Sequence, residues 1–120
     1  MPADDASVPL ARRRVSSVVR AQGWRDRRVD DIALMTTELV TNAVEHARTP
    51  FTVTLDLTDE RLRVEIRDGC TAQPVANPAP AATDVTGRGL LMVARLADRW
   101  GVRPGVAGKS VWFESTPDRE

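Results

Sequence analysis

Two segments of the sequence alternate apolar and polar residues, FTVTLDL at 51–57 and RLRVEIR at 61–67. Only Thr58, Asp59 and Glu60 separate them. Because successive side chains of a strand point to opposite faces, this alternation predicts an antiparallel hairpin with one buried face. The segment WGVRPGVAGKSVWFE at 100–114 predicts two more strands around a Gly-rich turn. The apolar face of such a sheet must be buried against another layer of structure.

Three segments have the apolar spacing of helices. The first extends from Val8 until Gly23 interrupts the pattern, and the second extends from about Val29 to Ala47. The third is GLLMVARLADRW at 89–100. The second helix has Asp30 and Asp31 near its positive end and an apolar stripe of Ile32, Met35, Leu39 and Ala43. We therefore predict one α/β domain over residues 1–120, an α+β two-layer sandwich with helices on one face of a mixed, mostly antiparallel sheet. Its core or the edge of its core should contain Trp24, Trp100 and Trp112.

Composition excludes several classes of protein. Lys plus Arg number 17 and Asp plus Glu number 17, so no overall field attracts nucleic acid or an anionic membrane. The three arginines at 12–14 are then better explained as a solvated helix face than as a nucleic-acid contact. One cysteine and one histidine form neither an internal disulfide nor an ordinary structural zinc site. With no signal-like start and no membrane-length apolar run, we expect a cytoplasmic protein.

Glu38, Asn42 and His46 lie four residues apart within TTELVTNAVEH at 36–46. In an α-helix each step of four residues turns by only about 40°, so these side chains form one narrow row. Such a row is often an ordinary solvated stripe, and taken alone it indicates nothing more. Its place in the order of motifs changes that interpretation. The row is followed by a strand ending in Asp68-Gly69, a loop rich in Pro and Ala, and Gly-x-Gly opening a helix.

This order resembles the GHKL, or histidine kinase-like, ATPases, and most closely their small anti-sigma-factor serine/threonine kinases of actinobacterial type. The resemblance covers about residues 8–115. ELVTNAVEH corresponds to the family's N-box, RDG to a reduced first glycine box and TGRGL to the second, while GKSVWFE corresponds to the closing strand. The resemblance implies the histidine kinase-like ATPase fold with ATP and Mg²⁺ as cofactors, and it implies that residues 69–86 form a lid over the nucleotide.

Roles for single residues follow from the resemblance together with their chemistry. Asn42 supplies an amide oxygen to Mg²⁺, which prefers oxygen ligands and retains water, and Glu38 is the general base of phosphoryl transfer. Asp68 accepts a hydrogen bond from the adenine amino group, and Gly69 leaves room for the ring. The other implied contacts are phosphate or metal-shell contact by His46, a phosphate cradle at Gly87, Arg88, Gly89 and Leu90, and a contact near the base by Ser110.

The sequence departs from the family pattern at two places. Cys70 stands where the first glycine box usually has Gly, and Val85 and Thr86 stand where several kinases of the group have an Arg. If that Arg assists transfer, this chain binds ATP and phosphorylates slowly or not at all.

These features leave three possible functions, of which we favour the first. The first is an ATP-Mg²⁺-binding regulatory protein that resembles anti-sigma factors and phosphorylates a Ser or Thr of a small antagonist protein. The alternative is a nucleotide-gated module that binds its partner without kinase activity, and a structural adaptor without nucleotide is a third possibility. The expected partners are a sigma factor and its antagonist, with neither nucleic acid nor membrane contacted directly and with a homodimer as in many relatives.

Overall fold

The computed structural model describes residues 1–47, 49–69, 91–104 and 108–117, with residues 46 and 47 described by their backbone alone. The helices are α1 (Ser7–Ala21) and α2 (Asp26–Asn42), and α2 continues into the π-helix η1 (Ala43–Ala47). Residues 91–96 are also helical. The third predicted helix was expected within 89–100, but it ends at Leu96 and a strand begins at Arg99. The strands are β1 (Phe51–Leu57), β2 (Leu62–Asp68), β3 (Arg99–Pro104) and β4 (Lys109–Ser115). No helix in these described ranges is long and apolar enough to cross a membrane.

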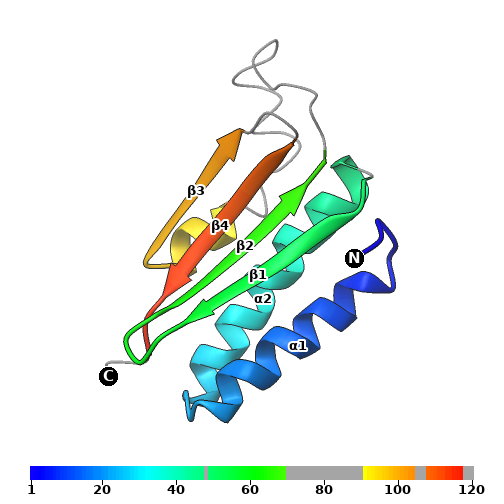
Figure 1. The fold of residues 1–120 in the computed structure, drawn as a ribbon. Coiled ribbons are helices and arrows are strands. Elements are labelled where there is room, and N and C mark those ends of the chain that lie inside the picture. The colour runs from blue at the N-terminus through cyan, green and yellow to red at the C-terminus, as the bar shows by residue number, and fades with distance from the viewer. Residues whose placement is uncertain (48, 70–90, 105–107, 118–120) are drawn as a thin grey trace.

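The four strands form one sheet in the order β1-β2-β4-β3, and α1, α2 and the helical residues 91–96 lie on one face of it (Figure 1). This arrangement confirms the predicted two-layer sandwich. The expected mixture of strand directions does not occur among the described strands, where every neighbouring pair is antiparallel. Because β2 lies in the middle beside β4, the end of β2 lies next to the beginning of β4.

Alternation along β2 explains why the hairpin forms as predicted. Leu62, Val64 and Ile66 are buried, while the side chains between them lie on the other face of the sheet. The hairpin turn is closed by the Thr58 N–H, which donates to the Arg61 carbonyl at 2.9 Å. The hairpin register thus places these apolar side chains on the face of the sheet that packs against the helices.

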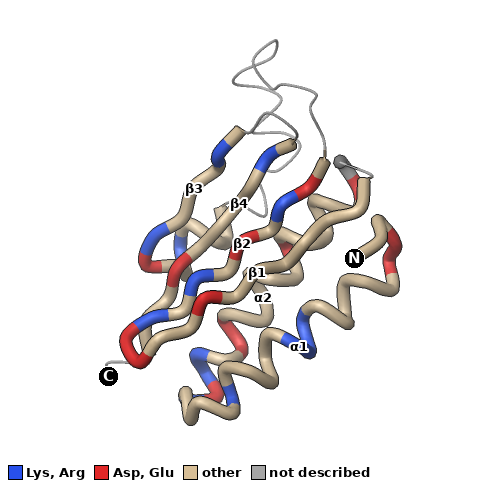
Figure 2. The backbone as a smooth tube through the Cα atoms, viewed as in Figure 1, with Lys and Arg blue, Asp and Glu red and all other residues tan. Residues whose placement is uncertain are grey.

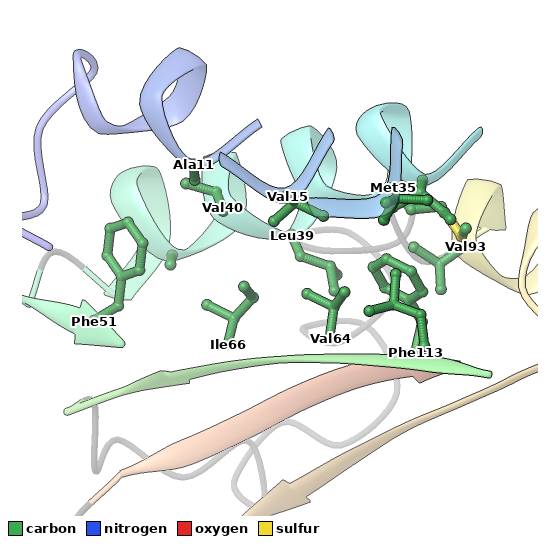
Figure 3. Packing of buried hydrophobic residues seen from close by; sticks show 14 of the residues in the cluster. Ala11, Val15, Met35, Leu39, Val40, Phe51, Val64, Ile66, Val93 and Phe113 are labelled. Carbon is green, nitrogen blue, oxygen red and sulfur yellow. The ribbon is translucent and has the colours of Figure 1, made fainter. Parts of the chain in front are cut away.

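The core lies between this face and the helices (Figure 3). α1 contributes Ala11 and Val15, and α2 contributes Met35, Leu39 and Val40, which face Phe51, Val64, Ile66 and Phe113 of the sheet. The stripe predicted for the second helix is buried at all four positions, Ile32, Met35, Leu39 and Ala43. The predicted start at Val29 was three residues late, because the extended backbone ends at Arg25 and the polar residues 26–28 already form the first turn.

The prediction for the tryptophans was correct only in part. Trp24 is buried, at 8% exposed, but Trp100 is 39% exposed because it lies on the edge strand β3. Trp112 lies on the face of the sheet opposite the helices, where the Arg63 guanidinium covers its ring at 4.1 Å. A Cβ at Gly101 would approach the same ring to 2.8 Å, so this glycine leaves the space that the indole occupies. Strand register therefore outweighed the preference of these large side chains for the core.

Candidate nucleotide site

The C-terminal part of α2 lies against the end of β2 and the beginning of β4, and a pocket lies between them. Most of its lining is apolar, and the polar groups come from three elements. The lining residues are Leu39, Asn42, Ala43, Ile66, Asp68, Val102, Lys109 and Val111. An apolar pocket with a few convergent polar groups is the usual form of a small-molecule site.

Asp68 is the most buried charged residue of the pocket, at 5% exposed. It is the last residue of β2, and neighbouring segments contact the peptide group between Asp68 and Gly69. The Gly69 N–H donates to Thr49 Oγ1 at 2.9 Å, which fixes the chain just after the strand. Gly108 passes so close to the carbonyl of the same peptide group that a Cβ there would lie 1.9 Å from the Asp68 carbonyl oxygen. Contacts with Thr49 and Gly108 therefore position the peptide group that follows Asp68.

Asn42 ends α2 and is half-buried at the same pocket. The sequence separates Asn42 from Asp68 by 26 positions, and the packing of α2 on the sheet brings both to one place. This juxtaposition of an amide and a carboxylate is the central feature of the candidate site.

The helix changes its geometry directly after Asn42. Residues 43–47 form a π-helix, in which hydrogen bonds join residues five apart and the turn is wider than in an α-helix. The predicted row assumed α-helical spacing throughout, and that spacing holds from Glu38 to Asn42 but not from Asn42 to His46. The side chain of His46 lies outside the described part of the chain. Single π-helical turns are common at functional sites, which agrees with a site at this point.

Glu38 lies one turn before Asn42 on α2 and is half-buried. It does not line the pocket, although its neighbour Leu39 does. The structure thus places Asn42 and Asp68 together and Glu38 about 6 Å further along the helix axis.

The remaining predicted residues divide into three groups. Gly69 follows Asp68 directly and donates its N–H to Thr49, but it does not line the pocket. Ser110 was expected to contact the ligand near the base, but it does not line the pocket. It is buried on the opposite face of the sheet, at the register position of Arg67 and Arg103. Gly87, Arg88, Gly89 and Leu90 lie outside the described residues, as does the predicted lid apart from Gly69.

Sequence reasoning missed Lys109, which lines the pocket in place of Ser110. The signal was present in GKSVWFE, because Val111 and Phe113 are apolar and Lys109 shares their face by alternation. Thr49 and Gly108 were also missed as positioning residues. Their contacts join segments far apart in the sequence, so no local pattern marks them.

Similarity to known proteins identifies the family of this chain. The family model of the histidine kinase-like ATPase domain matches residues 1–114. The chain belongs to the histidine kinase-like ATPase family. No curated protein matches it.

Among solved structures, this histidine kinase-like domain is similar to the histidine kinase domain of a blue-light activated histidine kinase from Erythrobacter litoralis. The identity is 26% and the TM-score 0.56, and the match covers 75% of the present chain. It covers 45% of the other chain, so this domain corresponds to less than half of that structure. The family membership and the likeness agree with the fold predicted from the order of motifs.

Proposed function

We propose that this domain binds ATP together with Mg²⁺ in the pocket between α2, β2 and β4. The observation that carries the proposal is the buried Asp68 carboxylate in an apolar pocket that Asn42 also lines. A buried carboxylate can only accept hydrogen bonds, so it favours a ligand with a donor such as the amino group of adenine. Leu39, Ile66 and Val111 offer apolar surface for a flat ring.

The residues present are also suited to Mg²⁺ that arrives with a nucleotide. No group of three or more His, Cys, Asp or Glu residues suited to a metal occurs among the described residues, so a metal cage made by the protein is not expected there. Mg²⁺ needs few protein ligands when phosphate oxygens and water complete its shell, and the Asn42 amide oxygen can supply one. Bound Mg²⁺ would neutralise phosphate charge during transfer.

For the activity, we propose a regulatory kinase that transfers phosphate to a Ser or Thr of a small antagonist protein and binds a sigma factor as its other partner. The resemblance of ELVTNAVEH, RDG and TGRGL to the anti-sigma kinases supports this proposal, as does membership of an ATPase family. In this mechanism Glu38 accepts the proton of the attacking hydroxyl, while Asn42 and Asp68 orient the nucleotide.

One observation favours a second candidate, a nucleotide-gated module that binds its partner without transferring phosphate. Glu38 is half-buried and does not line the pocket that Asn42 and Asp68 share. Nucleotide binding is common to both candidates, so turnover decides between them.

The test pairs ATP affinity with partner phosphorylation at fixed Mg²⁺. Asn42→Ala should weaken Mg²⁺-dependent binding, because the triphosphate is then poorly neutralised. Glu38→Gln should bind ATP normally and lower transfer by about 10²–10⁴-fold, the usual range for a general base. Glu60→Gln removes a carboxylate from the exposed hairpin turn and serves as the matched control that changes neither property.

Each result tests one of three points: the role of Asn42, the role of Glu38, or the choice between the two functions. Normal binding of ATP-Mg²⁺ by Asn42→Ala would contradict the metal role of that residue. Equal turnover of parent and Glu38→Gln would remove Glu38 as the base. A parent that binds ATP with no turnover on candidate antagonists would favour the binding module.

A further inference from the structure

Lys109 is the single lysine among 17 basic residues, and it begins β4 at the pocket. Its direct cross-strand neighbour is Asp68 at the end of β2. In Figure 2 the end of β2 is red and the beginning of β4 is blue, and both lie at the same end of the sheet. A carboxylate and an ammonium thus come from adjacent strands to one small pocket.

Their geometry follows from the register. Directly opposed residues of antiparallel strands have Cβ atoms about 4.5–5.5 Å apart, and their side chains share a face. Both residues line the pocket, together with Ile66 and Val111 two positions along each strand. The pocket therefore has a hydrogen-bond acceptor and a charged donor side by side, next to an apolar wall.

From this pairing we infer that Lys109 determines the choice of base, an inference that rests on the proposed nucleotide site. The Lys109 ammonium donates to ring nitrogen N1 of adenine, while the Asp68 carboxylate accepts from the exocyclic amino group. Adenine presents this donor and this acceptor on adjacent atoms of one edge, which matches the adjacent positions of the two side chains.

The same pair disfavours guanine. In guanine the carbonyl O6 would face the Asp68 carboxylate, and the N1–H would face the Lys109 ammonium. Acceptor would meet acceptor and donor would meet donor, so two contacts become unfavourable at once. Specificity of this kind arises from the polar groups left unpaired by the wrong ligand.

The experiment measures binding of ATP, 1-deaza-ATP and GTP by calorimetry in the presence of Mg²⁺. 1-Deaza-ATP has a C–H in place of N1 and keeps the amino group, so it removes only the contact assigned to Lys109. The parent should bind ATP about 10–100-fold more tightly than 1-deaza-ATP, the range for a hydrogen bond with a charged donor.

Lys109→Met keeps an unbranched side chain and removes the donor. It should bind ATP and 1-deaza-ATP within about twofold of each other and should discriminate less well between ATP and GTP. Arg103→Met is the control, because it removes a cation from the neighbouring strand on the opposite face of the sheet. This control should retain the discrimination of the parent.

Two results would overturn the inference while leaving the nucleotide site intact. One is a parent that binds ATP and 1-deaza-ATP equally, a comparison that needs no variant. The other is a Lys109→Met variant that discriminates between them as the parent does. A parent that binds none of the three nucleotides would instead overturn the proposed function, and this inference with it.

Discussion

Gly108 is the residue whose replacement the structure tolerates least at the site. Its φ is 156°, and a Cβ at this position would lie 1.9 Å from the Asp68 carbonyl oxygen, which leaves no space for a side chain. Gly108→Ala should therefore displace the beginning of β4 from the end of β2. We expect a loss of unfolding free energy of about 1–3 kcal/mol and weaker ATP binding, measured by denaturant unfolding and calorimetry.

Gly23→Ala provides the control for a glycine effect without a clash. Gly23 has a φ of 87°, and nothing lies within 4 Å of a Cβ placed there. The left-handed backbone should cost about 1–2 kcal/mol of stability and leave ATP affinity unchanged. Normal ATP affinity in Gly108→Ala would show that the close approach does not position Asp68.

At the scale of elements, Arg28 connects the N-terminal part of α2 to the other end of the sheet. Its Nε donates to the Thr116 carbonyl at 2.9 Å, and its guanidinium also contacts the Leu96 carbonyl and the Asp98 carboxylate. Asp98 in turn accepts from the Thr116 N–H at 2.7 Å. One side chain thus joins α2, the end of the helical residues 91–96 and the residue after β4.

Arg28→Met should lower the unfolding free energy by about 1–3 kcal/mol, because several partially buried acceptors lose their donor. ATP affinity should be unchanged, since residues 28 and 42 are separated by about 21 Å along the helix axis. Arg27→Met removes the exposed neighbouring guanidinium and should be close to neutral. Equal stability of the two variants in denaturant unfolding would show that the Arg28 contacts do not contribute.

At the scale of the whole molecule, nucleotide binding should stabilise the folded domain because the pocket requires elements from separate parts of the chain. ATP-Mg²⁺ at about 100 times its dissociation constant adds about 2.7 kcal/mol, which raises Tm by about 8–15 °C for a domain of this size. Thermal unfolding with and without nucleotide measures this rise.

Asp68→Asn should lose most of that rise, because the pocket then presents a donor where the ligand also has one. Asp56→Asn, an exposed carboxylate on β1, should retain the rise. A full rise in Asp68→Asn would contradict the assignment of Asp68 to the adenine contact.

Local patterns were sufficient to predict the elements of this fold. Alternation at 51–57 and 61–67 fixed the hairpin, and apolar spacing in α1 and α2 fixed which helix faces are buried. The order of motifs also predicted that Asn42 and Asp68 belong to one nucleotide site; the structure shows that both line one pocket, and their roles stay predictions. The strands and helices depend on side chains near one another in the sequence, which is why these elements were predictable.

The assembly of the pocket was decided by tertiary structure. The cross-strand pairing of Asp68 with Lys109 joins residues 41 positions apart, and Gly108, the residue before β4, lies against the Asp68 backbone at the end of β2. The same register placed Ser110 away from the pocket and Trp112 on the outer face. The sequence by itself determined which residues form strands and helices and which polar types are available. Only the packing of those elements determined which polar groups meet, because that depends on register and distance between segments far apart in the chain.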